Sequence, residues 1–132
     1  MQEEMTIGRL AKSAGVNVET IRYYQRRGLI AEPNKPLGGH RRYPARLVMQ
    51  LGFIRRAQQL GFSLEEVKGL LRHADGRSPR ETRAIAERKY EVLESRIAEL
   101  TSMRRKLKAM ITASGKPGAR GDPIIVALSI PD

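Results

Sequence analysis

The sequence predicts a mainly α-helical fold, in which a winged helix-turn-helix domain is followed by a long dimerising coiled-coil helix. Three observations predict it. Two short helical patterns, ended by Gly15 and Gly28, follow each other near the N-terminus. A segment rich in proline and glycine then covers residues 31–43. Beyond Pro79, a stretch without further glycine or proline carries apolar residues at alternating steps of four and three.

The chain is strongly basic, with a formal net charge of +11 over 132 residues. Residues 1–62 hold 11 Lys and Arg against 4 Asp and Glu, whereas residues 63–132 hold 14 against 10. Because each cation near a phosphate releases counterions, this balance favours a nucleic acid as the partner. An anionic membrane surface is the alternative. The absence of Trp and the aromatic content of only 5% argue against an interfacial anchor.

The chain contains no cysteine, which excludes a disulfide, a thiolate metal site and a cysteine nucleophile. The two histidines lie apart, and no phosphate-binding glycine loop follows a strand pattern. We therefore expect no catalytic residue, no cofactor and no enzyme activity. The N-terminus lacks the apolar core of a signal peptide, and no apolar run is long enough to span a bilayer. These features predict a cytoplasmic protein without a membrane partner.

The two short helices form the predicted helix-turn-helix, with Thr6 and Asn17 as their N-caps. In the second helix the residues expected to face the core are Val18, Ile21, Tyr24 and Leu29. The residues expected to face outward are Thr20, Arg22, Tyr23, Arg26 and Arg27. A basic and aromatic outer face of this kind is typical of a helix that enters the DNA major groove.

A small wing and two further helices are expected next. Gly38-Gly39 can form a hairpin turn with a strand over residues 40–43, which predicts a two-stranded wing with Arg41 and Arg42 at its tip. Pro44 suits the first position of the following helix. The apolar side of that helix consists of Leu47, Val48, Leu51, Ile54 and Leu60. Ser63 and Glu66 form a capping box that starts another helix, which ends near Arg72.

The long helix over 79–113 carries an apolar stripe that we call the seam: Ala86, Tyr90, Leu93, Ile97, Leu100, Leu107 and Ile111. Arg104 interrupts it, and the neighbouring Met103 can fill the gap. So small a chain cannot bury this stripe by itself. We therefore expect the helix to pair with a second copy, in an antiparallel or parallel coiled coil, and to form a twofold dimer. The expected dimer contacts are Tyr90, Leu93, Ile97, Leu100, Leu107 and Ile111.

These patterns divide the chain into three expected regions. Residues 1–75 form the winged helix-turn-helix domain and residues 79–113 the coiled-coil helix. Residues 114–132 form a flexible loop followed by a short apolar tail, Ile124 to Leu128. Because this apolar run is too short to stand alone, we expect it to pack on the coiled coil or on the partner chain.

Five segments of the sequence resemble the MerR family of transcription regulators. They are Ile7-Gly-Arg-Leu-Ala-Lys12, Val18-Glu-Thr-Ile-Arg-Tyr-Tyr-Gln-Arg-Arg-Gly-Leu29, Gly38-Gly-His-Arg-Arg-Tyr43, Phe53-Ile-Arg-Arg-Ala-Gln58 and Leu60-Gly-Phe-Ser-Leu-Glu-Glu66. The resemblance covers nearly the whole chain and is strongest to the mercury-responsive members. It implies an antiparallel coiled-coil dimer with an effector region after the long helix.

The resemblance also implies a mechanism. Such dimers bind a palindromic operator that lies between promoter elements spaced too far apart. An effector lets the dimer bend and untwist the DNA, so that RNA polymerase can use the promoter. The DNA contacts implied at matching positions are Arg22, Tyr24, Arg41, Tyr43 and Arg55, with Thr20 and Tyr23 as further candidates. Of the two neighbouring tyrosines, one is expected to pack in the core and the other to touch phosphate.

The chain departs from the family's pattern at the metal site. Mercury-responsive members bind their metal through three cysteines, and the matching positions here hold Pro79, Ser114 and Asp122. Proline offers no ligand, and serine and aspartate are hard oxygen donors that suit a soft metal poorly. We therefore predict no metal site and no tight mercury binding, and the effector stays open.

Two other functions stay open as well. The chain could be an effector-independent repressor or architectural protein, including a relative of the mercury regulators that has lost its metal response. In vitro transcription with candidate effectors separates this function from that of a regulator. The chain could instead be a coiled-coil adaptor whose basic head binds RNA or an anionic membrane. Equal affinity for RNA, vesicles and operator DNA would indicate the adaptor.

Overall fold

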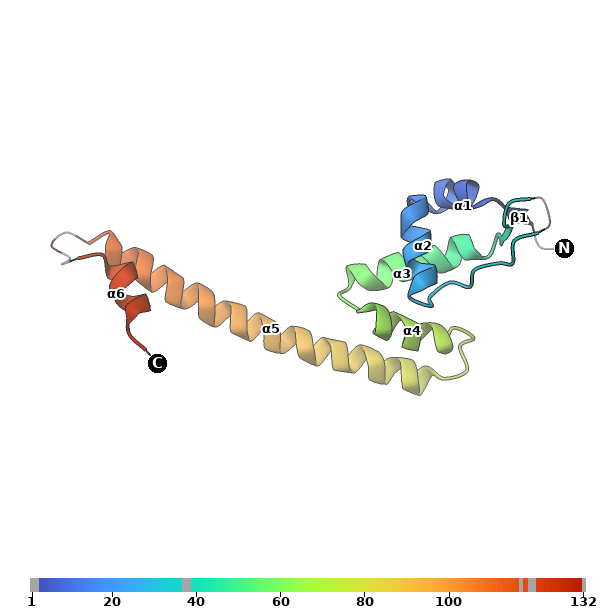
Figure 1. Cartoon of the computed structure of the whole chain (residues 1–132). Helices are drawn as coiled ribbons and strands as arrows, with labels where there is room; N and C mark the ends of the chain where they lie inside the picture. Colours follow the sequence, from blue (N-terminus) through green and yellow to red (C-terminus); the bar gives the residue numbers. More distant parts are fainter. Residues whose placement is uncertain (1–2, 37–38, 117, 119–120, 132) are drawn as a thin grey trace. The chain divides into compact units, whose positions relative to one another are not determined.

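A computed structural model describes residues 3–36, 39–116, 118 and 121–131 of the chain. The described residues are mainly helical, as predicted, and they divide into two units, Met1–Lys89 and Tyr90–Asp132. Figure 1 shows the elements of each unit along the chain. None of the helices that the structure describes has an apolar stretch of the length that a bilayer crossing needs.

The first unit contains short helices and one small sheet. In chain order its elements are β1 (Glu4–Met5), α1 (Ile7–Ala14), α2 (Val18–Arg26), β2 (Tyr43–Pro44), α3 (Leu47–Gln59), α4 (Leu64–Arg72) and the beginning of α5 (Pro79–Ser114). The rest of α5 and the short helix α6 (Pro123–Ser129) make up the second unit.

The turn between α1 and α2 follows the predicted capping. The Thr6 hydroxyl accepts a hydrogen bond from the backbone N–H of Arg9 at 3.3 Å, and the Asn17 side-chain oxygen accepts one from Thr20 at 2.9 Å. Gly15 ends α1 with a φ of 69°, a left-handed conformation that side chains with a Cβ rarely adopt. The two predicted N-caps are confirmed, and they fix where α2 begins.

The core of the first unit lies where α1, α2 and α3 pack together, closed by Val67 of α4. Leu10, Ile21, Leu51 and Ile54 are fully buried in it. Its other buried members are Ala11, Tyr24, Leu29, Ile30, Tyr43, Leu47 and Ala57. Burial of a large aliphatic side chain stabilises the fold by about 1.5–3 kcal/mol, so this cluster holds α2 firmly by its inner face.

The wing differs from its prediction. β2 pairs with β1 in an antiparallel ladder, with Met5 opposite Tyr43, and among the described residues no second strand of the predicted hairpin lies beside it. The expected strand over residues 40–43 is therefore wrong except at Tyr43. Half of the expected hairpin turn, Gly38, lies outside the described residues. The hydrogen bonds of the β2 ladder come from the N-terminal strand β1. This strand lies too far away in the chain for a hairpin pattern to indicate it.

Two details of α3 were also predicted wrongly. Pro44 lies in β2, and α3 begins at Leu47. Leu60 is 68% exposed because α3 ends at Gln59 and the chain turns at Gly61. The capping box of α4 is confirmed. The Ser63 hydroxyl accepts a hydrogen bond from the backbone N–H of Glu66, and the Glu66 carboxylate accepts one from the backbone N–H of Ser63.

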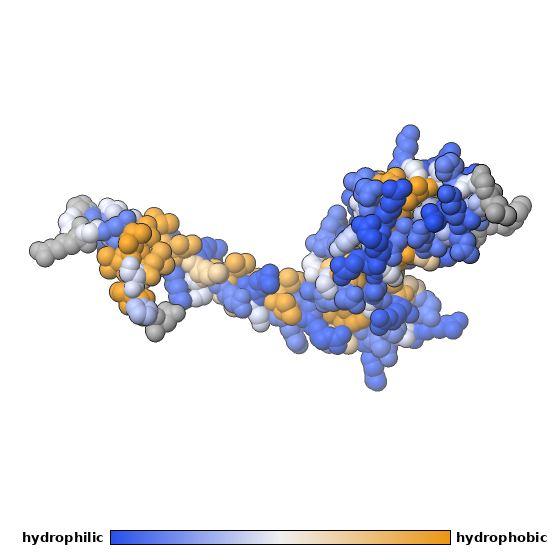
Figure 2. Space-filling view, in the orientation of Figure 1, coloured by the Kyte–Doolittle hydropathy of each residue, from blue (hydrophilic) through white to orange (hydrophobic). Residues whose placement is uncertain are grey.

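The second unit leaves its apolar residues on the surface. The six expected dimer contacts, from Tyr90 to Ile111, are all exposed in the single chain. The apolar tail forms a helix, α6, whose first turn is capped by Asp122. Figure 2 shows apolar residues gathered over α6 and the end of α5. Exposed apolar patches of this kind mark surfaces through which proteins associate.

Candidate DNA interface

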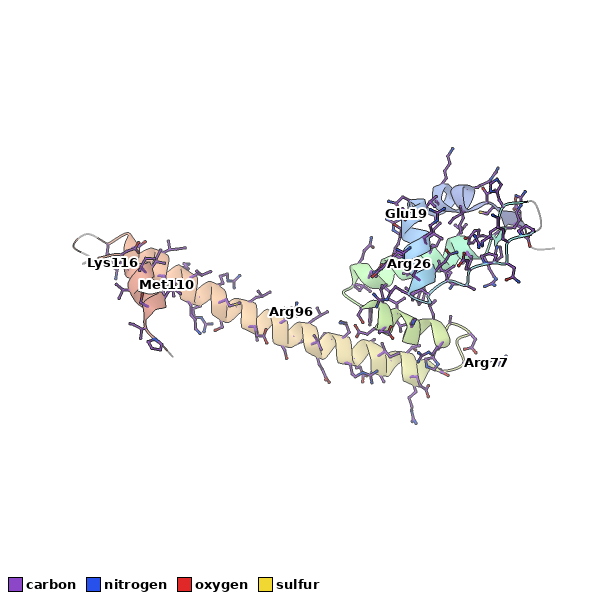
Figure 3. All side chains as sticks on the ribbon, viewed as in Figure 1. Glu19, Arg26, Arg77, Arg96, Met110 and Lys116 are labelled. Atoms are coloured by element: carbon purple, nitrogen blue, oxygen red, sulfur yellow. The ribbon has the colours of Figure 1, made fainter. Side chains whose placement is uncertain are left out.

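Helix α2 presents a basic outer face because its inner face is fixed in the core. Ile21 and Tyr24 are buried, and the helical period places the side chains between them on the opposite side. The exposed residues of this face are Glu19, Arg22, Tyr23, Arg26 and Arg27. Figure 3 labels Glu19 near the beginning of α2 and Arg26 near its end. The structure therefore leaves a full face of α2 free to contact a ligand.

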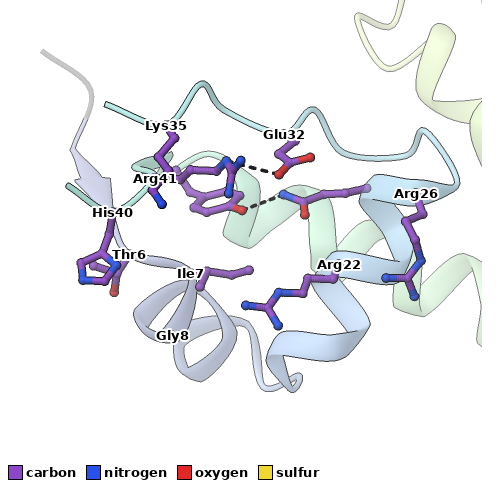
Figure 4. A pocket seen from close by; sticks show the side chains of 11 residues that line it. Thr6, Ile7, Gly8, Arg22, Arg26, Glu32, Lys35, His40 and Arg41 are labelled. Atoms are coloured by element: carbon purple, nitrogen blue, oxygen red, sulfur yellow. Dashed lines mark hydrogen bonds and ion pairs between the residues drawn. The ribbon is translucent and has the colours of Figure 1, made fainter. Parts of the chain in front are cut away.

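A cleft of about 680 Å³ lies between the beginning of α1, the face of α2 and the wing segment. Its charged side chains, among the residues that the structure describes, are Arg22, Arg26, Lys35, Arg41 and Glu32. Figure 4 shows these side chains lining the cleft, with Thr6 and His40 beside the beginning of α1. Four cations against one carboxylate make this cleft attractive to a polyanion.

Two of these arginines are held by weak surface ion pairs. Arg22 Nη1 lies 2.9 Å from Glu19 Oε1, and Arg41 Nε lies 3.2 Å from Glu32 Oε1. Arg41 also donates to the backbone carbonyl of Pro33 at 3.0 Å. Exposed pairs of this type contribute only about 0–1 kcal/mol. Either guanidinium can therefore exchange its carboxylate for a phosphate or a base at low cost.

Tyr23 is exposed but held in place by two arginines. The guanidinium carbons of Arg26 and Arg27 lie 5.9 and 5.8 Å from its ring centroid, and Arg27 Nη1 donates to its hydroxyl at 3.0 Å. Such cation–π contacts order the ring and both charges together. The three side chains thus form an aromatic and cationic cluster on the surface of α2.

The structure places two predicted contact residues, Tyr24 and Tyr43, in the core. The Tyr24 hydroxyl donates to Gln58 Oε1 at 2.7 Å, and Gln25 Nε2 donates to the Tyr43 hydroxyl at 2.7 Å. Burial raises the pKa of Tyr24, with the charge of Arg55 acting in the opposite direction, so the hydroxyl stays a neutral donor. In this position the two tyrosines join α2 to α3 and to β2.

The remaining candidates, Arg55 of α3 and Thr20 of α2, contact the turn between α1 and α2. Arg55 Nη1 donates to the carbonyls of Ala14 and Gly15, each at 3.3 Å, and so satisfies the C-terminal end of α1. The Thr20 hydroxyl donates to the Asn17 side chain at 2.8 Å. Both residues line a shallow pocket beside Gly15. They border the face of α2 but are engaged in supporting the turn.

Sequence patterns missed several residues of the cleft. The helical period predicts Arg26 on the outer face, but Gln25, three residues after Arg22, was missed although the same period could have found it. Lys35 and His40 lie in an irregular segment whose path no periodicity predicts. Only the structure brings them to the same cleft as α2.

The residues that the resemblance matches to metal-binding cysteines, Pro79, Ser114 and Asp122, carry no ligand for a soft metal. Pro79 begins α5 and has no donor atom. The Ser114 hydroxyl donates to the carbonyl of Ile111 at 2.8 Å, and the Asp122 carboxylate accepts from the backbone of Ile124 at 3.0 Å. Within the described ranges, no three His, Asp or Glu side chains gather as metal ligands would. The residues present therefore do not fit a thiolate-bound metal.

Comparison with known proteins places this geometry in a family. A family model described as MerR HTH family regulatory protein matches residues 5–74, and one described as MerR, DNA binding, matches residues 48–110. The mercuric resistance operon regulatory protein of Shigella flexneri is 44% identical over 127 residues, which cover 96% of this chain and 88% of that protein.

Two solved structures share the fold. The regulator PbrR691 of Ralstonia metallidurans CH34, in complex with lead(II), superposes with a TM-score of 0.81 at 28% identity, covering 94% of this chain and 98% of that one. The regulator MerR of Bacillus megaterium MB1, in complex with mercury(II), has a TM-score of 0.71 at 34% identity, with 96% and 100% covered. The predicted fold class, a helix-turn-helix domain with a long helix, is confirmed.

Proposed function

We propose, on the premise that this chain belongs to the MerR family of transcription regulators, that it acts as a twofold dimer on palindromic promoter DNA. Membership of the family makes the chain a DNA-binding transcription regulator and not an enzyme. The operator lies in an over-long promoter spacer, and the dimer acts by distorting the DNA for RNA polymerase. The observation that carries the proposal is the exposed basic face of α2 beside the cationic cleft.

The proposed contacts follow from exposure and charge. Arg22 and Tyr23 of α2 contact the major groove and its flanking phosphates, because they lie on the face that the core leaves free. Arg41 of the wing segment binds a neighbouring phosphate. Tyr24, Tyr43, Arg55 and Thr20 hold α2, β2 and the turn in position, as their hydrogen bonds indicate.

Dimerisation through the seam is supported by its exposure. Leu93, Ile97, Leu100 and Leu107 present apolar side chains in heptad register along one helix, and all four are exposed in the single chain. Burying them against a second copy removes this apolar surface from water. A twofold axis also matches a palindromic operator, because each copy of α2 then meets an equivalent half-site.

The effector is proposed to be something other than a thiolate-bound metal. Pro79, Ser114 and Asp122 stand where the family carries cysteines, and the last two are engaged in local hydrogen bonds. A second candidate function rests on the same observation. The chain can be an effector-independent repressor or architectural protein, derived from a metal-responsive relative, that occupies its operator permanently.

The test of the proposed DNA contact compares two arginine variants of the full chain. Arg22→Ala removes a cation of the cleft, and Arg80→Ala removes an exposed cation of α5 outside it. Arg22→Ala should weaken binding to a selected operator by about 5- to 150-fold and reduce the salt dependence of the binding constant. Arg80→Ala should leave binding near that of the wild type. Unchanged operator affinity of Arg22→Ala would contradict the proposed placement of α2.

A further inference from the structure

We infer that Glu19 determines base specificity by accepting a hydrogen bond from the N4 amino group of a cytosine in the major groove. This inference rests on the proposed function, namely that the outer face of α2 enters that groove. Glu19 belongs to no set of contacts that the sequence or the family resemblance supplied. The structure brings it forward because it is the acidic residue of an otherwise basic and exposed face.

The position of Glu19 suits a contact with bases. It lies in the first turn of α2, one residue after Val18 begins the helix, and its side chain is 73% exposed. The N-terminal residues of a recognition helix are those that contact base edges, while the surrounding cations contact phosphates. The ion pair with Arg22 holds the Glu19 carboxylate on the outer face, at a distance of 2.9 Å.

The chemistry of a carboxylate selects cytosine. An ionised carboxylate only accepts hydrogen bonds, so beside a polyanion it is unfavourable unless it meets a donor. The donors that bases offer in the major groove are the amino groups of cytosine and adenine. Adenine carries the acceptor N7 next to its amino group, which would repel the second carboxylate oxygen. Cytosine has no such acceptor on this edge, so it is the base that Glu19 fits.

A purely structural role for Glu19 is the competing explanation. An acidic residue in the first turn stabilises a helix through its dipole, and the ion pair with Arg22 joins residues three positions apart. Helix α4 offers an internal comparison. Glu65 occupies the equivalent position one residue after Leu64, is 69% exposed and lies 3.7 Å from Lys68, three residues on. Glu65 thus reproduces the local setting of Glu19 on a helix that does not line the cleft.

The experiment selects binding sites from a randomised duplex DNA pool with the full-length protein. Wild type, Glu19→Ala, Glu19→Gln and the matched control Glu65→Ala are compared at one salt concentration. In the wild type, one position of each half-site should favour cytosine by about 5- to 150-fold. Glu19→Ala should lose that preference alone. Glu19→Gln should shift it towards adenine, because an amide pairs with both N6 and N7. Glu65→Ala should select the wild-type site.

Three outcomes would overturn the inference, and one of them would overturn the proposed function as well. If Glu19→Ala selects the complete wild-type site and changes only the overall affinity, Glu19 acts through the helix and not through a base. If Glu19→Gln keeps the preference for cytosine, the acceptor lies elsewhere. Either result leaves the proposed function intact. If the wild type itself selects no site, both the inference and the proposed function fail.

Discussion

Oε1 of Glu66 lies 2.9 Å from Nζ of Lys89, so an ion pair joins the first turn of α4 to α5. The same oxygen accepts a hydrogen bond from the backbone N–H of Ser63 at 2.8 Å. The two charged side chains are only 31% and 16% exposed, which shields this pair from water and salt more than the other ion pairs of the unit. Glu66 thus caps α4 and also anchors the long helix α5 to it.

This relationship predicts an acid-dependent loss of stability. The hydrogen bond from the backbone of Ser63, and after it the contacts with Lys89, hold the pKa of Glu66 below its ordinary value of 4.5. A carboxyl whose pKa is lower in the folded state stabilises the fold fully above the unfolded-state pKa. That contribution disappears as the pH falls through the folded-state pKa.

The measurement is urea unfolding of wild type and Glu66→Gln between about pH 3 and about pH 7. The wild type should have the larger free energy of unfolding near neutral pH, and the difference should shrink below pH 4.5. Glu65→Gln, which removes an exposed carboxylate from the same turn, is the control for the loss of one charge. A difference that is equally large at both ends of the range would contradict the role given to Glu66.

The core of the first unit predicts a strong dependence on α3. Ile54 is fully buried, so Ile54→Ala should lower the free energy of unfolding by about 2–5 kcal/mol. Met49→Ala, at a residue of the same helix that is 80% exposed, should change it by less than about 0.5 kcal/mol. Chemical unfolding of both variants measures the two free energies. Equal losses would mean that α3 does not pack as described.

The seam predicts which substitutions separate the two copies. Ile97→Asp puts a charge in the middle of the proposed dimer contact, where burial of an unpaired carboxylate is strongly unfavourable. Val92→Asp is the matched control, because Val92 has similar exposure but lies off the heptad row. Light scattering coupled to gel filtration should find Ile97→Asp shifted to the monomer and Val92→Asp still dimeric. Two dimeric variants would exclude this seam as the contact.

The absent cysteines predict a lack of tight mercury binding. Isothermal titration of the wild type with mercury(II) should show no stoichiometric tight site, because no thiolate is present. The triple variant Pro79→Cys, Ser114→Cys and Asp122→Cys restores the family's three donors and should bind mercury tightly. Tight stoichiometric binding by the wild type would show that oxygen and nitrogen donors suffice.

The sequence predicted α1, α2, α4 and α5 well because their signals are local. The caps at Thr6, Asn17 and Ser63 depend on residues three positions apart, and the long helix on an uninterrupted period. The wing was harder to predict. The strand partner of Tyr43 is Met5, far away in the chain, so no nearby pattern contains it.

The candidate site likewise contains residues whose positions local patterns predict and residues whose positions they do not predict. Arg22 and Tyr23 could be assigned to the outer face of α2 from the helical period. The burial of Tyr43 and the approach of Lys35 to the cleft depend on how separate segments pack. The resemblance to a family indicated which residues matter, but not whether each touches DNA or holds another residue in place. Hydrogen bonds such as that between Gln25 and Tyr43 are the observations from which we propose a positioning role for Tyr43.

Footprinting of the wild-type protein on its selected DNA site, together with the stoichiometry of the complex, tests the central claim most directly. The claim is that two copies of α2, related by a twofold axis, occupy successive major grooves on one face of the operator. It predicts two chains for each site and a palindrome whose half-sites are separated by about 10 base pairs or a multiple of that distance. One chain bound to an asymmetric site, or equal affinity for random duplex DNA, would contradict it.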